Sequence, residues 1–279
     1  MNTSNLTVRK IPFNLEHVDI LWNKKNPSFS NFINKFSFWA PALERYVCRV
    51  IREAQDHIHD PETAQEAKLF FQQEAEHSKS HLKHVKRMVE LYPGLQAASD
   101  RINAHYDQLY RDHSMEYHLA YIAGLEATFS PAFRSLIEGR RPLFSTGDAN
   151  VSSLCLWHFN EEIEHRSSAL MVYNAVVGRT WYRLCQFRSV VKHVKDGFRV
   201  LEEEFGKAIP KGDRGPMPEL KESPFGRLPV GLRLKLKVGI VLAQAPWHDP
   251  SSEKVPEWSQ DWFNRYAKGE DMSKYYGIS

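Results

Sequence analysis

The chain has few cysteines, no long apolar run and no large excess of charge of one sign. Its three cysteines form no C-x-x-C pair, and their odd number argues against a disulfide framework and favours a reducing cytoplasm. No window contains the roughly 18 consecutive apolar residues that a membrane span requires. The first thirty residues mix charged residues with proline and lack the apolar core of a signal peptide. We therefore expect a cytoplasmic protein with no transmembrane segment.

The charge balance also excludes a class of partner. The net charge of the 279 residues is only +3, from 37 Lys and Arg against 34 Asp and Glu, and the basic residues are scattered along the chain. Nucleic-acid binding is therefore not expected. The hydrophobic fraction of 42% and the charged fraction of 25% are ordinary for a globular protein of this length, which can bury a sizeable core.

Apolar residues recur at helical spacing over the first three quarters of the chain. Helices are expected over residues 31–59, 61–92, 96–138, 151–177 and 181–207. Asp60 and Pro61 are suited to the N-cap and the first position of the second helix. Pro131 should bend the third helix or end it early. The pattern predicts an all-α bundle.

The pattern changes after residue 209. Five prolines between Pro210 and Pro229 predict a linker, and Leu232–Ala245 is apolar with a basic start. Within that segment, residues 232–238 are the one run that alternates like a strand. We expect a helical domain with an irregular N-terminal arm over residues 1–209, and a linker with a C-terminal extension packed on it over residues 210–279. Docking of the basic segment on a membrane surface is an alternative, but packing on the bundle or on a second subunit is simpler, which leaves a homodimer open.

Two copies of Glu-x-x-His carry the chemistry, and each copy follows a lone glutamate in an apolar helical stretch. The six residues are, in chain order, Glu44, Glu74, His77, Glu126, Glu162 and His165. The lone glutamates precede their motifs by 30 and 36 residues, separations that fit two antiparallel helices joined by a short turn. All six side chains would then meet at one depth of a four-helix bundle, where such a set holds two metal ions.

The residue types suit a dinuclear site. Carboxylates are hard donors that can bridge two cations, and neutral imidazole suits iron. Four carboxylates balance the charge of two divalent ions. We expect iron, with a manganese–iron pair or zinc as alternatives. The first three of the six residues would hold mainly one ion and the last three the other, with one or two glutamates bridging the ions.

Two further histidines share these helix faces. His158 lies four residues before the glutamate of the second motif, which makes it a candidate third imidazole ligand; a core histidine bonded to a neighbouring helix is the alternative. His81 lies four residues after the histidine of the first motif. We expect His81 and Glu161 to contact the ligands rather than the metal.

The six residues resemble the di-iron carboxylate sites of the ferritin-like superfamily, and the chain is similar over most of its length to a bacterial family labelled predicted metal-dependent hydrolases. The pattern His-x-x-x-Glu-x-x-His at residues 158–165 further resembles the arylamine N-oxygenases, where a third histidine joins the di-iron site. These resemblances imply a ferritin-like four-helix bundle with an additional helix and a C-terminal extension. Many ferritin-like sites carry an aspartate directly before each Glu-x-x-His, whereas here Gln73 and Glu161 occupy those positions.

The candidate dinuclear site is compatible with three functions. The leading one is an oxygenase in which two irons activate dioxygen for hydroxylation, desaturation or N-oxygenation of a small organic substrate. No flavin or iron–sulfur motif is present, so electrons would come from a separate donor. The alternative is a dinuclear metal-dependent hydrolase, in which the metals activate water. The third is iron oxidation and storage, or peroxide scavenging, against which the absence of C-x-x-C pairs counts.

Overall fold

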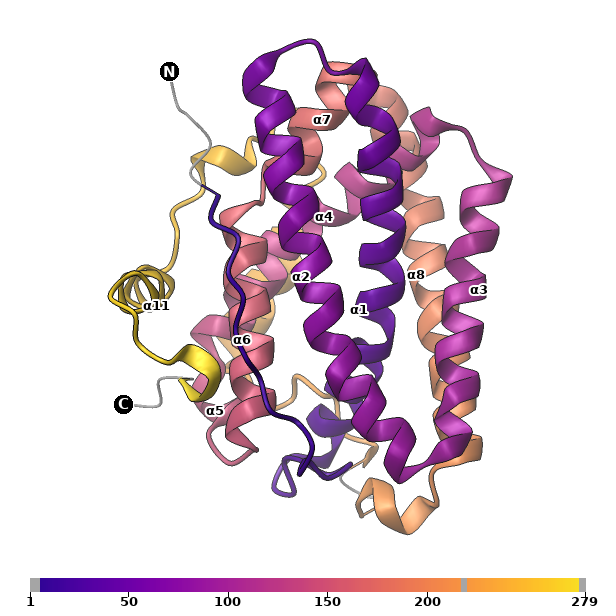
Figure 1. Cartoon of the computed structure of the whole chain (residues 1–279), viewed down its shortest axis with the longest axis vertical. Coiled ribbons are helices and arrows are strands. Elements are labelled where there is room, and N and C mark those ends of the chain that lie inside the picture. Colours follow the sequence, from indigo (N-terminus) through magenta and orange to yellow (C-terminus); the bar gives the residue numbers. More distant parts are fainter. Residues whose placement is uncertain (1–5, 217–219, 276–279) are drawn as a thin grey trace.

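Long helices packed side by side form the core of the protein (Figure 1). The computed structural model describes residues 6–216 and 220–275, and their regular structure is helical, with no β-strand among them. The α-helices are α1 (Pro27–Ala54), α2 (Pro61–Leu91), α3 (Gln96–Asp112), α4 (Met115–Glu138), α5 (Arg140–Phe144), α6 (Ala149–Glu164), α7 (Ser168–Val176), α8 (Thr180–Ala208), α10 (Val230–Leu242) and α11 (Glu257–Ala267). The expected all-α bundle is confirmed.

Four helices, α1, α2, α4 and α6, surround the centre of the bundle. Helix α1 packs along α2, and α4 packs on α6, while α3 and α8 pack on each other and on α1. The N-terminal arm before Pro27 runs along α2 and α6 (Figure 1): Gln73 of α2 donates to the carbonyl of Thr7, and Arg87 donates to that of Val18.

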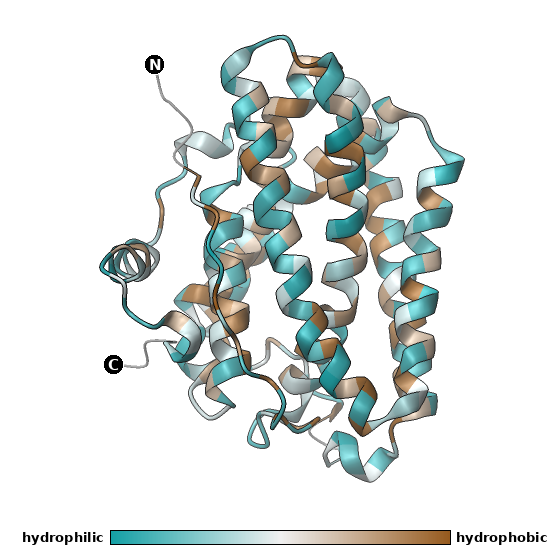
Figure 2. Ribbon diagram, viewed as in Figure 1, coloured by the Kyte–Doolittle hydropathy of each residue, from teal (hydrophilic) through white to brown (hydrophobic). Residues whose placement is uncertain are grey.

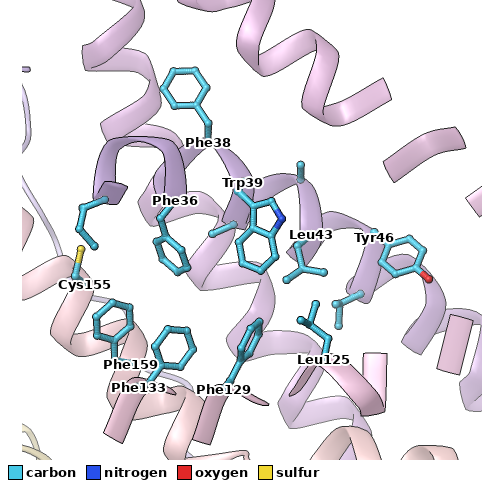
Figure 3. Close-up of a cluster of buried hydrophobic side chains, with 14 of the residues drawn as sticks. Phe36, Phe38, Trp39, Leu43, Tyr46, Leu125, Phe129, Phe133, Cys155 and Phe159 are labelled. Carbon is cyan, nitrogen blue, oxygen red and sulfur yellow. The ribbon is translucent and has the colours of Figure 1, made fainter. Parts of the chain in front are cut away.

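Amphipathic patterning explains this arrangement, because each helix buries its apolar stripe against its neighbours. In Figure 2 the face of α2 turned to the viewer is mostly hydrophilic. Aromatic side chains fill the inner layer, where Phe36 of α1 meets Phe133 of α4 and Phe159 of α6 (Figure 3). The rings of Phe133 and Phe159 stack with centroids 4.5 Å apart. Such contacts set the spacing of the three helices.

The start of α2 matches the expectation. Asp60 is the N-cap, its carboxylate accepts from the backbone N–H of Thr63 at 2.8 Å, and Pro61 is the first helical residue. The cap satisfies one of the orphan N–H groups at the helix start, and proline has no N–H to lose there.

Three expectations about helix boundaries were wrong. Residues 96–138 form two helices, because the chain breaks at His113–Ser114 and α4 then runs through Pro131 to Glu138. Residues 151–177 are likewise divided into α6 and α7 by a break directly after Glu164. Residues 232–238 are not a strand but part of α10.

The chain beyond Pro210 returns to the bundle at several points. Helix α10 packs on α4, where a side-chain amide of Gln244 donates to the carbonyl of Gly124. Helix α11 lies beside the N-terminal arm, with Trp262 fully buried. None of the described helices is long and apolar enough to cross a membrane.

The close approach of α10 to α4 makes a prediction about two glycines of the same helix. A Cβ on Gly239 would lie 2.6 Å from the Cβ of Pro131, whereas one on Gly231 would meet nothing within 4 Å. Gly239→Ala should therefore lower the free energy of unfolding by about 1–3 kcal/mol through overpacking. Gly231→Ala, the matched control, should cause no loss because alanine is the better helix former. Urea denaturation measures both, and equal stabilities would contradict the packing described.

Candidate metal centre

The predicted ligands meet in the interior of the bundle. Helix α1 supplies Glu44, α2 supplies Glu74 and His77, and α4 supplies Glu126. Helix α6 supplies His158 and Glu162, and His165 is its C-cap residue. Each of these seven side chains is at most 3% exposed. Four carboxylates and three imidazoles therefore share one buried volume.

The donor atoms form two groups. Glu44, His77 and His158 make one group and Glu74, Glu162 and His165 the other, and within each group one donor atom per residue lies within 4.8 Å of the others. Glu162 spans both groups. Its Oε1 lies 2.8 Å from His158 Nε2, and its Oε2 lies 3.1 Å from His165 Nε2.

Glu74 and Glu126 also lie close to the histidine nitrogens. Glu74 Oε1 is 3.4 Å from His165 Nε2 and 3.7 Å from His77 Nδ1, so it too lies between the groups. Glu126 Oε2 is 3.7 Å from His165 Nε2. The grouping differs from the expected one. Glu74 reaches across the bundle toward His165, while His158 takes a place beside His77, on which its ring stacks with centroids 4.2 Å apart.

Several donor atoms at the centre have no hydrogen-bond partner among the described residues. They are Glu44 Oε1 and Oε2, Glu74 Oε1, His77 Nδ1 and Glu126 Oε2. A buried polar atom without a partner is costly, and a buried carboxylate without a counter-charge more so. These atoms face one another, and a bound cation would satisfy all of them. The donor set therefore fits two divalent ions, with hard oxygen donors and borderline imidazoles in each group.

Each of the three histidines presents one ring nitrogen to the centre and the other to an outer partner. The Nε2 of His77 bonds to Glu161 Oε2 at 3.0 Å. The Nδ1 of His165 bonds to Gln73 Oε1 at 3.0 Å, and the Nδ1 of His158 bonds to His81 Nε2 at 2.8 Å. Outer partners of this kind fix the orientation and tautomer of metal-binding histidines.

These outer partners are exchanged between the two motifs. Glu161 directly precedes the second Glu-x-x-His but bonds to the histidine of the first, and Gln73 directly precedes the first but bonds to the histidine of the second. The positions directly before the two motifs are therefore filled by different side chains that do the same task. The residue before each motif thus orients the histidine ring of the other motif.

An arginine from the N-terminal arm ties the outer partners together. Arg9 Nη1 donates to Glu161 at 2.9 Å and to Glu164 at 2.8 Å, and Glu164 also accepts from the Gln73 side chain at 2.7 Å. Arg9 is 4% exposed, so its charge offsets that of two carboxylates in a poorly solvated place. Sequence reasoning missed Arg9, because an isolated arginine in an aperiodic arm gives no signal.

The C-terminal segment covers this network. The guanidinium of Arg9 lies against the rings of Trp262, Phe263 and Tyr266, with the Phe263 centroid 4.6 Å away. Arg166, the residue after His165, donates to the carbonyls of Pro250, Ser251 and Glu253. The extension therefore packs on Arg9 and anchors the chain directly after the candidate ligand His165.

His81 lies one step further from the centre. It bonds to His158, and its other nitrogen contacts the hydroxyl of Ser37 at 3.0 Å, which also contacts His84 at 2.9 Å. Within the part of the chain that the structure describes, His81 hydrogen-bonds to His158 and to no other candidate ligand, so its position suits the outer role expected of it. Its partner His158 is oriented as a ligand would be.

Burial and contacts with neighbouring groups shift the pKa values of the central carboxylates in different directions. Burial raises the pKa of Glu44 and that of Glu126 well above the usual glutamate value. Burial would also raise the pKa of Glu162, but the charges and hydrogen bonds of His165 and His158 outweigh it and lower that pKa. Burial, with the charge on His77, lowers the pKa of His158 to about 4. His158 is therefore neutral near pH 7 and has a lone pair for a cation.

Comparison with known proteins agrees with this centre. A family model described as predicted metal-dependent hydrolase matches residues 7–200. The chain belongs to this family. No curated protein and no solved structure matches the chain. The part shared with the family of predicted metal-dependent hydrolases contains all seven candidate ligands and Arg9, whereas α10 and α11 lie beyond it.

The arginine network makes a prediction about metal affinity. Arg9→Ala removes the donor that holds Glu161 and Glu164, so we expect the affinity for a divalent ion to fall about 10–100-fold, as for other outer partners of metal ligands. The control is Lys10→Ala, which removes the neighbouring but exposed cation. Zinc titration by calorimetry measures both variants. Equal affinities would show that Arg9 does not support the centre.

Metal binding should also depend on pH. Because the pKa values of Glu44 and Glu126 are raised, both groups retain protons at pH values where an ordinary glutamate is ionised, and a cation must displace those protons. The apparent affinity should therefore still rise with pH above the range in which an ordinary glutamate titrates, with protons released on binding. Calorimetry in buffers of different ionisation enthalpy counts these protons. A constant affinity without proton release would contradict the raised pKa values.

Proposed function

We propose that the protein is a dinuclear metal-dependent hydrolase. The observation that carries the proposal is the buried set of seven donor side chains, five of whose atoms have no hydrogen-bond partner in residues 6–216 and 220–275. The description of the family supports the choice of hydrolysis. Metal ions bound at this centre would supply Lewis acidity toward an ester, amide or phosphate and would activate water at neutral pH.

The residues have separate tasks in this proposal. Glu44, His77 and His158 would hold one ion, and Glu74 and His165 would hold the other, with Glu126 beside that group. Glu162 would serve both groups, since its two oxygens face different histidines. Glu161 and Gln73 hold the imidazole rings in place, and Arg9 keeps the charge of Glu161 compensated.

The substrate would approach from the end of α6. A pocket of about 930 Å³ lies there between α2, the α6–α7 link and the C-terminal segment. Its lining includes Glu164 and Arg166, the residues on either side of His165. Four carboxylates and two cations line it: Glu62, Glu66, Glu164, Glu257, Arg166 and Lys254. This balance favours a neutral or cationic substrate over a phosphate ester.

A second candidate function is oxidation by dioxygen at a di-iron centre. The donor set favours it, because four glutamates and three histidines suit redox iron better than the mixed aspartate and histidine sets common in dinuclear hydrolases. In this case bound iron would supply the oxygen chemistry, and an external donor would supply electrons. The protein residues would keep the tasks given above.

One series of measurements tests both candidates. The metal content of the purified full chain is determined by elemental analysis, and the protein is assayed against ester, amide and phosphate substrates with zinc, manganese or iron. The iron-loaded protein is then reduced without air and mixed with oxygen while its visible spectrum is followed. Metal-dependent hydrolysis without an oxygen response supports the proposal. Two irons, a transient absorption and no hydrolysis would replace it with the oxidase or oxygenase.

A matched pair of variants tests the centre itself. Glu74→Gln removes a central carboxylate charge, so the variant should lose at least half of the bound metal and most of the activity. Glu76→Gln, two residues along α2, alters a glutamate that pairs with Lys79 at 2.7 Å and should keep both. Full metal content in the Glu74→Gln variant would refute the assignment of that ligand.

A further inference from the structure

Helix α10 is apolar on two opposite faces, although only one of them is packed. Its inner face meets α4, where Gly239 lies against Pro131 and Ala243 is buried. Its outer face carries Val230, Leu234, Val238 and Val241, which are 71%, 62%, 47% and 72% exposed. We refer to these four residues as the α10 stripe.

The spacing of the α10 stripe makes it one continuous surface. Its members follow one another at intervals of four, four and three residues, so they lie within about 80° on the helix surface. Leu242, which is 56% exposed, extends the surface at the end of the helix, and Trp247 follows at 82% exposure. A helix that is apolar all round is normally buried. An exposed apolar patch of this kind marks a site of interaction.

The segment that carries the α10 stripe is basic, although one of its cations, Lys235, pairs with Glu138 of α4 at 3.5 Å. Residues 223–248 contain no aspartate or glutamate but four basic residues, although acidic and basic residues are nearly balanced in the whole chain. The four are Arg227, Arg233, Lys235 and Lys237. Arg233 and Lys237 line a shallow pocket of about 290 Å³ together with Val230 and Leu234 of the stripe. The occupant of this surface must therefore combine an apolar layer with negative charge.

We propose that the α10 stripe docks the protein on an anionic lipid surface. The valines and leucines would enter the boundary between headgroups and acyl chains, while the lysine and arginine side chains extend to the lipid phosphates. Trp247 is of the residue type enriched at that boundary. The helix lies on the surface of the bundle, so it contacts the lipid without unfolding.

A second copy of the chain fits this surface less well. In a symmetric dimer the α10 stripe would face itself, which brings the basic residues of one copy next to those of the other. Glu138 pairs with Lys235, but no acidic residue within 223–248 could compensate the other three. Like charges opposed across an interface are unfavourable, whereas an anionic membrane neutralises them.

Co-sedimentation of the full chain with lipid vesicles tests the proposal. Vesicles of phosphatidylglycerol with phosphatidylcholine should bind the protein, and binding should weaken with salt. The double variant Leu234→Glu/Val238→Glu should lose at least about tenfold in partition, and Lys235→Gln/Lys237→Gln about fivefold per charge removed. Leu82→Glu is the matched control, because Leu82 is an exposed leucine of α2 with 47% exposure. Thermal melts confirm that each variant is folded.

Several outcomes would overturn the proposal. The wild-type chain fails to sediment with the anionic vesicles, or it binds equally well to vesicles of phosphatidylcholine alone. The α10 variants bind as tightly as the Leu82→Glu control. Ultracentrifugation finds a dimer that the α10 variants dissolve, with no vesicle binding, in which case a second copy covers the α10 stripe.

Discussion

Four carboxylates are buried at the centre of this bundle, and the residues around them offset the free-energy cost of removing their charges from water. A carboxylate removed from water without a counter-charge costs several kcal/mol even after relaxation. Here Glu44, Glu74, Glu126 and Glu162 come from four helices to one place. Three imidazoles face them, and four of the carboxylate oxygens have no hydrogen-bond partner among the described residues. Metal binding is therefore part of what makes this core a favourable arrangement.

The outer partners extend the same logic by one layer. A histidine that binds a cation through one nitrogen needs an acceptor at the other, and here Glu161, Gln73 and His81 fill that need. Glu161 is itself a buried charge, which Arg9 offsets. Each layer therefore contacts the next one outward: the imidazoles face the carboxylates, the outer partners bond to the imidazoles, and Arg9 bonds to Glu161. The aromatic rings of α11 then cover Arg9.

Spacing along the chain was enough to predict that the candidate ligands lie close together, but not what surrounds them. The seven candidate ligands lie at intervals set by helix periodicity and by the lengths of antiparallel helices, so local pattern indicated them. Arg9 reaches the site from an arm without periodicity, and its role depends on residues more than 150 positions away. No glycine or proline marks the break after Glu164. The chain is instead held there by hydrogen bonds from Arg166 to carbonyls distant in the sequence, which no local pattern reveals. The break before α4, by contrast, carries a signal in Ser114 at the N-cap and Glu116 in the first turn. The strand-like alternation of residues 232–238 gave a wrong prediction, because a helix that is apolar on both faces shows no clear helical period of apolar residues.

The contact between Arg9 and the rings of α11 has a consequence for the order in which the protein matures. The arm precedes the bundle helices in the chain, and α11 follows them. During synthesis the seven donors can therefore gather before the aromatic cover over Arg9 exists. The network around Arg9 is complete only when α11 has been made and has docked.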